Sequence, residues 1–142
     1  MLGPKEFYLE HKDNIKDHYE LHENIGDPTT SRVRRGVHRM QKISRAIKVV
    51  RKEDLEFGER RKLLEEINLL KKLDHPNIVS VQEMFEDKKR LYFVSDMLQG
   101  GTIFERFSKN PSFPEHTCAK IVRQLLSAAS YLHSQGYVHG DI

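Results

Sequence analysis

Residues 46–50 read Ala46-Ile47-Lys48-Val49-Val50, a β-branched run that a single lysine interrupts. Such a run predicts a strand packed against a core. The predicted strand extends over residues 43–50. A lysine in the apolar centre of a strand is costly to bury unless an anion reaches it. Lys48 is therefore the first candidate functional residue of the chain.

The next segment, residues 56–73, shows the period of a helix. Its apolar side chains fall on one side of a helical wheel, and the segment closes at residues 74–77, Asp-His-Pro-Asn. Glu66 falls on that same apolar side, between Leu70 and Leu73. We expect its carboxylate to pair with Lys48, because an unpaired buried charge is costly. The alternative is that both side chains reach water independently.

The remaining elements follow from the same patterns. Strands are predicted near residues 19–26, 33–37, 78–85 and 91–98, with a turn-rich segment at 27–31. Residues 5–16 are polar and are expected to be helical. Pro114 opens a long helix whose apolar stripe ends before Gly136; its members are Ile121, Val122, Leu125, Ala129 and Leu132.

Composition sets bounds on the class of protein. The chain has 142 residues, of which 37% are hydrophobic and 32% charged, so it can bury one modest core. No apolar run approaches the roughly 20 residues that span a bilayer, and no signal core follows Met1, so no membrane contact and a cytoplasmic location are expected. Its basic clusters lack interleaved aromatic residues, which argues against a nucleic-acid partner.

Other site chemistries find little support in the sequence. His18 and His22 have i,i+4 spacing, but residues 19–21 favour a strand, where such spacing does not converge, so no metal site is expected. No calcium loop of the D-x-D-x-D-G type is present. Gly26 is not followed by a helix pattern, which argues against a dinucleotide or P-loop motif.

Several motifs stand in a fixed order along the chain: residues 46–48 (Ala-Ile-Lys), 66–79, 91–96, 100–106 and 131–139. Together they resemble the N-terminal half of a eukaryotic Ser/Thr protein kinase domain of the calmodulin- and calcium-dependent group. In that resemblance residues 66–79 correspond to the C helix and its connecting loop, and residues 91–96 to strand five entering the hinge. Residues 100–106 are similar to the G-G-E-L-F-D-R of these kinases.

The resemblance implies an α+β fold with a kinase N-lobe, which is a five-stranded antiparallel sheet plus the C helix. The hinge and the first helices of the C-lobe follow. It implies an N-terminal extension over residues 1–18, the N-lobe and hinge over 19–98, and the start of the C-lobe over 99–142. The chain then ends within the catalytic loop, at Val138-His139-Gly140-Asp141-Ile142.

The resemblance also implies a role for each matching residue in transferring the γ-phosphoryl group of ATP to protein hydroxyls. Lys48 binds the ATP phosphates and is held by Glu66, and Asp141 is the catalytic aspartate. The adenine site is expected to comprise Val33 and Ala46 on its faces, Ser95 as gatekeeper, the backbone of Asp96, Met97 and Leu98, and Gly26 from the glycine-rich loop. Both magnesium ligands of the family lie beyond this chain.

Departures from the glycine-rich loop and from H-R-D keep a second hypothesis open. Residues 26–33 retain only the first glycine, Gly26, and carry Pro28 and Ser31, and Gly140 replaces the arginine of H-R-D. Thr102 replaces the glutamate of G-G-E, which lowers the expectation of a preference for basic substrate residues. The alternative is a pseudokinase or scaffold lobe that binds a protein partner without catalysis. The 142-residue chain alone is expected to be inactive, and helix 114–135 is expected to pack on the rest of a C-lobe or to self-associate.

Overall fold

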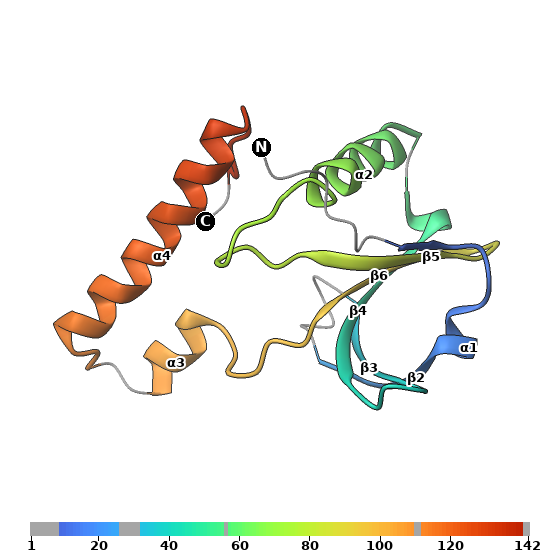
Figure 1. Cartoon of the computed structure of the whole chain (residues 1–142), viewed down its shortest axis with the longest axis horizontal. Helices are drawn as coiled ribbons and strands as arrows, with labels where there is room; N and C mark the ends of the chain where they lie inside the picture. Colours follow the sequence, from blue (N-terminus) through green and yellow to red (C-terminus); the bar gives the residue numbers. More distant parts are fainter. Residues whose placement is uncertain (1–8, 26–31, 56, 110–111, 141–142) are drawn as a thin grey trace. The chain divides into compact units, whose positions relative to one another are not determined.

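A six-stranded sheet organises the first part of the chain (Figure 1). The structure is a computed structural model that describes residues 9–25, 32–55, 57–109 and 112–140. The strands are β1 (Leu9–His11), β2 (Tyr19–Asn24), β3 (Val33–His38), β4 (Ser44–Arg51), β5 (Val81–Glu86) and β6 (Arg90–Asp96). Strands β2 to β6 confirm the strands predicted from the sequence.

The sheet has the order β1-β5-β6-β4-β3-β2, and all of its pairs are antiparallel except that of β1 with β5. The five predicted antiparallel strands are confirmed as β2 to β6, but the prediction missed a sixth strand. Leu9–His11 adds a parallel edge strand in register with Glu83–Phe85. The helix predicted over residues 5–16 is also wrong where the structure describes it, because only α1 (Ile15–His18) is helical there.

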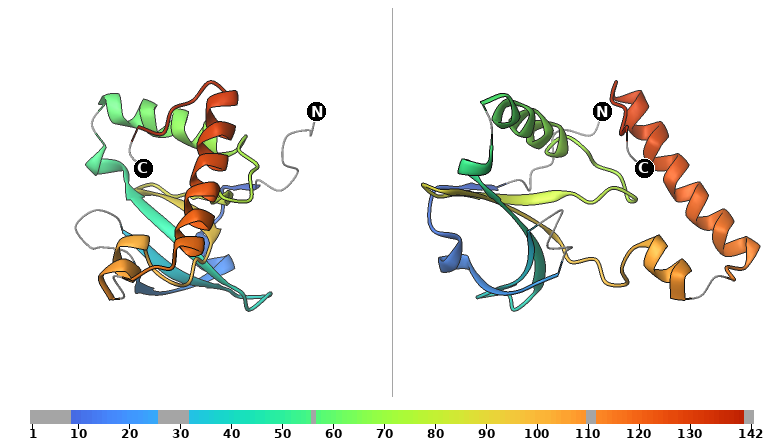
Figure 2. Two further views of the ribbon diagram at one scale, coloured as in Figure 1. Left: turned by 90° about the vertical axis from the view of Figure 1, so that its left-hand side faces the viewer. Right: turned by 180° about the vertical axis from the view of Figure 1, so that it is seen from behind.

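Helix α2 (Phe57–Leu70) covers one face of the sheet, as Figure 2 shows from two sides. Ile67 from the helix is buried together with Leu91 and Phe93 of β6, and Val50 and Met84 pack against them. The apolar spacing that predicted the helix is thus the spacing of its buried side. A 3-10 turn, η1 (Lys52–Asp54), connects β4 to this region.

The opposite face of the sheet carries the other core cluster. Its most buried side chains are Tyr19, Ile47, Phe85 and Val94, and Ile15 of α1 packs with them. Gly36 of β3 lies against this cluster, and a Cβ at that position would overlap the Cδ1 atom of Ile47. Glycine is therefore needed here for close packing.

The β5–β6 turn is held by the carboxylate of Asp87. Its Oδ1 atom accepts hydrogen bonds from the backbone N–H groups of Lys89 and Arg90, both at 2.7 Å. Its Oδ2 atom accepts the Tyr92 hydroxyl at 2.8 Å. Burial raises the pKa of Asp87, but these hydrogen bonds together outweigh that effect and leave the pKa below its ordinary value. Burial, followed by the Asp87 carboxylate, raises the pKa of Tyr92.

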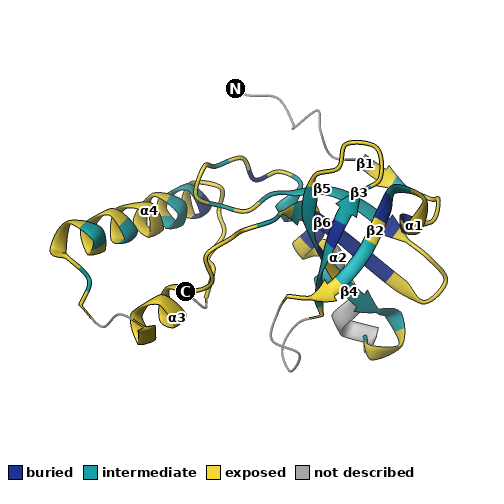
Figure 3. Cartoon of the chain, turned by 90° about the horizontal axis from the view of Figure 1, so that it is seen from below, coloured by how far each residue is buried: buried dark blue, intermediate teal, exposed yellow. Residues whose placement is uncertain are grey.

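The chain divides into two compact units, of which the first is Met1–Asp74 with Ser80–Met97 and the second is His75–Val79 with Leu98–Ile142. The second contains α3 (Ile103–Lys109) and α4 (Glu115–Ser134). Most residues of α4 are exposed, as the yellow colouring in Figure 3 shows. Within the described ranges, no helix has both the length and the apolar character to cross a bilayer.

A capping box begins α3. The Thr102 N–H donates to Oε2 of Glu105 at 2.7 Å, and the Glu105 N–H donates to Oγ1 of Thr102 at 3.1 Å. Gly101 precedes the box with φ +70°, and a Cβ there would overlap the Glu105 carboxylate. Thr102, which departs from the glutamate of G-G-E in the resembling kinases, is therefore the N-cap that starts this helix.

Candidate functional site

Strand β4 presents Lys48 on the sheet face that α2 covers. In the antiparallel ladders Lys48 lies opposite Val33 on one side and Phe93 on the other. Directly opposed residues point their side chains to the same face, and Phe93 belongs to the cluster under α2. The structure thus brings Lys48 and Val33 together on that face. The side chain of Lys48 is exposed, so its ammonium group is open to solvent and to a ligand.

Ala46 and Ser95 extend the same face by one register step. They lie opposite each other in the β4–β6 ladder, and the Ser95 hydroxyl is 3.5 Å from the Ala46 carbonyl oxygen. Both side chains are half-buried, as is that of Val33. Side chains two residues apart in a strand point to the same face of the sheet, so Ala46 lies beside Lys48 on that face. The result is a small apolar surface next to an exposed cation.

The strand β6 ends at Asp96, whose side chain turns to the other face of the sheet. Arg45 forms an ion pair with Asp96, and the Gln82 amide donates to the same Oδ1 atom at 2.9 Å. Met97 closes the first unit and Leu98, which is exposed, opens the second. The Asp96 side chain is therefore held by Arg45 and Gln82.

The expected pair of Lys48 with Glu66 is not formed in the structure. Both side chains are exposed, and the described residues include no ion pair between them. The expected burial of Glu66 is wrong, because Ile67 takes the buried position on α2 while Glu66 lies at the edge of the apolar stripe and reaches water. Whether a bound nucleotide joins the two residues stays a prediction.

Two predicted site residues, Gly26 and Asp141, lie outside the described residues. Gly140, which directly precedes Asp141, is described, and it has φ +78°. This is the left-handed region, which glycine adopts without strain and an arginine does not. The departure from H-R-D at Gly140 is therefore accompanied by a backbone conformation that suits glycine.

One structural role was missed in the sequence analysis. His75, in the segment Asp-His-Pro-Asn, places Nε2 at 3.0 Å from the Ser127 hydroxyl and stacks on the Tyr131 ring, with 5.2 Å between ring centroids. Its Nδ1 accepts the Asn77 N–H at 3.1 Å. His75 therefore fastens this loop segment to α4 within the second unit. The motif was noted in the sequence, but a partner 52 residues away leaves no local pattern.

Comparison with known proteins agrees with this arrangement. The profile of the family described as Protein kinase domain matches residues 19–142, which is most of the chain. The chain therefore belongs to the protein kinase domain family. The match begins at Tyr19, the first residue of β2, so β1 and α1 precede it.

The similar proteins are kinases by name. The chain is 37% identical over 126 residues to "Probable serine/threonine-protein kinase fhkC" of Dictyostelium discoideum, covering 87% of this chain and 21% of that protein. It is 36% identical over 137 residues to "Calcium-dependent protein kinase 3" of Plasmodium yoelii yoelii, covering 96% of this chain and 25% of that protein. It is 35% identical over 124 residues to "Myosin light chain kinase A" of Dictyostelium discoideum, covering 87% of this chain and 42% of that protein.

A solved structure with the same fold is the "Crystal structure of Rad53 1-466 in complex with AMP-PNP", with a TM-score of 0.79 and 26% sequence identity. The match covers 90% of this chain and 33% of that one. The chain thus spans about a fifth to two fifths of the length of the curated relatives. The kinase fold class expected from the motifs is confirmed.

Proposed function

We propose that this chain is the nucleotide-binding part of a Ser/Thr protein kinase, whose full catalytic domain transfers the γ-phosphoryl group of ATP to protein hydroxyls. The observation that carries the proposal is the register of β3, β4 and β6. It places Val33, Ala46, Lys48 and Ser95 on one sheet face, with an exposed ammonium group beside a half-buried apolar surface.

The residues fit ATP in their chemistry. Apolar side chains such as Val33 and Ala46 suit the faces of an adenine ring, and the free ammonium of Lys48 suits phosphate. Phosphoryl transfer depends mainly on positioning and on electrostatic stabilisation, so a lysine held in a rigid strand is an effective phosphate ligand. Magnesium is expected to be held by residues beyond this chain, and Asp141 is expected to orient the substrate hydroxyl.

The finer assignment to the calcium-dependent group rests on the names of relatives such as "Calcium-dependent protein kinase 3" and on the motifs at residues 100–106 and 131–139. A protein substrate is the expected partner. The cytoplasmic location also stays a prediction from the sequence.

A binding experiment tests the nucleotide site on this chain directly. Titration of a fluorescent ATP analogue should show saturable binding, and Lys48→Met should weaken it at least about tenfold by removing the phosphate contact. Adenosine lacks phosphates, so Lys48→Met should leave its affinity nearly unchanged. Lys88→Met, at an exposed position of the β5–β6 turn, is the matched control. Equal losses from Lys48→Met for ATP and adenosine would contradict the assigned role.

Catalysis is to be measured on the parent protein that contains the complete kinase domain. Lys48→Met should greatly reduce phosphoryl transfer to a protein substrate, whereas Lys88→Met should not. Nucleotide binding without any transfer by the wild-type parent would instead support the non-catalytic hypothesis.

A further inference from the structure

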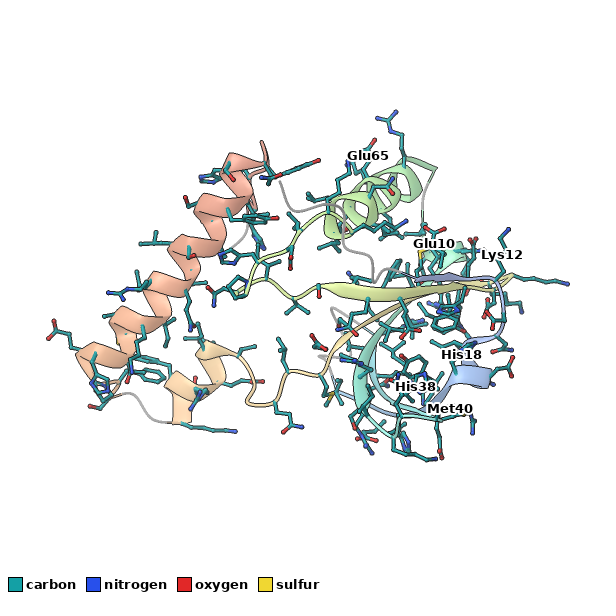
Figure 4. The ribbon with its side chains drawn as sticks, in the orientation of Figure 1. Glu10, Lys12, His18, His38, Met40 and Glu65 are labelled. Carbon is teal, nitrogen blue, oxygen red and sulfur yellow. The ribbon has the colours of Figure 1, made fainter. Side chains whose placement is uncertain are left out.

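The segment that precedes the kinase-family match brings two histidines and an aspartate together. His11 ends β1, Asp13 follows in the connection, and His18 ends α1. Each offers one ligand atom, and these atoms all lie within 4.8 Å of one another. Figure 4 labels His18 on α1, on the side of the sheet opposite α2. The kinase fold does not account for this cluster, because it lies before residue 19.

The distances suit a small metal ion. His11 Nδ1 is 3.6 Å from Asp13 Oδ1, and His18 Nε2 is 2.5 Å from Asp13 Oδ2. Two ligand atoms bound to one tetrahedral zinc ion, each about 2.0–2.2 Å from the metal, stand roughly 3.3–3.6 Å apart. The His11–Asp13 separation already meets that value. His18 would exchange its hydrogen bond with Asp13 for a bond to the metal.

A second carboxylate, that of Glu83, lies beside the ring of His11. Its Nε2 atom is buried and lies 3.1 Å from Oε2 of Glu83, although the direction does not complete a hydrogen bond. The other oxygen of Glu83 accepts the Tyr19 hydroxyl at 2.5 Å. A histidine that binds metal through one nitrogen commonly directs its other N–H to a carboxylate. Glu83 therefore favours the tautomer that leaves Nδ1 of His11 free as a ligand.

Aromatic contacts fix both imidazole rings. His11 stacks on Phe85, with 4.3 Å between ring centroids and an interplanar angle of 8°. The His18 ring lies 4.9 Å from that of His11 and 5.2 Å from that of Phe85. Phe85 is 1% exposed, so the support is part of the core. Ligands held in this way lose little conformational freedom when they bind a metal.

We propose that His11, Asp13 and His18 form a binding site for a transition-metal dication, with Zn²⁺ the best fit, that fastens β1 to α1. Two imidazoles and one carboxylate match the nitrogen and oxygen ligands of zinc and leave a fourth position for water. Mg²⁺ and Ca²⁺ prefer oxygen ligands alone and suit this set poorly. The site links the edge strand β1 to α1 by metal coordination in addition to the chain that connects them, so metal binding is coupled to stability.

The test uses the full chain with Cys118→Ser as background, because Cys118 is exposed and thiolates are zinc ligands in their own right. Chelator-treated protein is titrated with Zn²⁺ in a calorimeter and with Co²⁺ in an absorption spectrometer. One equivalent should bind, Co²⁺ should show visible bands of a four-coordinate ion, and the thermal midpoint should rise with Zn²⁺. Millimolar Mg²⁺ should produce none of these effects.

Single substitutions identify the ligands. His11→Gln, Asp13→Asn and His18→Gln should each weaken Zn²⁺ binding at least about tenfold, and Glu83→Gln should weaken it by roughly tenfold through His11. His22→Gln, in the neighbouring strand β2, is the matched control and should bind like the background protein. Asp13 is exposed, so Asp13→Asn is expected to fold normally. This variant therefore still tests the site if a histidine variant fails to fold. No saturable binding, or equal binding by Asp13→Asn, would overturn the proposal.

Discussion

At the scale of single residues, Tyr92 shows how a buried polar group is made stable. Its ring is 5% exposed, and its hydroxyl donates to the Asp87 carboxylate that holds the β5–β6 turn. Burial and then Asp87 raise the pKa of Tyr92 above its ordinary value. The protonated hydroxyl is therefore favoured in the folded state. Its stabilising effect is present below the unfolded pKa, near 10, and is lost as pH rises through the folded pKa.

Tyr92→Phe should lower the free energy of unfolding by about 1 kcal/mol at neutral pH, because it removes the hydrogen bond to Asp87. The difference between wild type and variant should shrink as the pH rises above about 10, where the unfolded tyrosine ionises. Urea unfolding across neutral and alkaline pH measures both effects. Tyr137→Phe, at an exposed position, is the control. A difference that stays constant with pH would contradict the role given to ionisation.

Residue roles could be predicted from the sequence only in part. Lys48 stood out because one charge interrupts an apolar strand, and the structure places it on the face that α2 covers. Val33, which lies opposite Lys48, and Ser95, which lies opposite Ala46, were assigned only through the family resemblance, because the register of strands cannot be read from a single sequence. Glu66 was expected to be buried, but helical periodicity alone does not resolve the edge of an apolar stripe from its centre.

At the scale of elements, long periodic segments were predicted and short ones were not. The spacing of Leu63, Ile67 and Leu70 identified α2. Runs of β-branched and apolar residues between turn-rich segments identified β2 to β6. Strand β1 has only three residues and depends on pairing with Glu83–Phe85, far along the chain. Because β1 was not predicted, nothing in the sequence indicated that His11 lies close to His18. Sequence spacing offered only His22 as a partner for His18, and no metal site was expected from that pair, because His22 lies in the strand β2.

Helix α3 offers a prediction at this scale, because its capping box is complete. Thr102→Ala removes the Oγ1 acceptor of the Glu105 N–H and should destabilise the start of the helix by about 1 kcal/mol. Faster hydrogen exchange of the Glu105 amide measures the effect, and Thr102→Ser, which keeps the hydroxyl, is the control. Unchanged exchange in Thr102→Ala would show that the box contributes nothing to this helix.

At the scale of the whole molecule, α4 presents an apolar face to solvent. Val122 is 51%, Leu125 42% and Leu126 64% exposed, while Leu132 is buried. Their spacing of three and four residues places them on one side of the helix. Exposed apolar side chains gathered in this way mark an interaction surface. Two residues of the predicted stripe, Val122 and Leu125, are thus exposed, and Leu126, which the prediction did not include, lies beside them.

We expect this chain to associate with itself through that face, because covering apolar surface is favourable at about 25 cal/mol per Å². Sedimentation velocity over a wide concentration range should show dimers or larger species. Leu126→Glu should shift the population toward monomer, because a charge at the centre of the contact must be desolvated to associate. Gln124→Glu adds the same charge at an exposed position of α4 outside the stripe and should change little. A chain that stays monomeric at all concentrations would show that the exposed face of α4 does not drive association. Equal effects of Leu126→Glu and Gln124→Glu would show that the added charge, and not the loss of the apolar contact, causes the change.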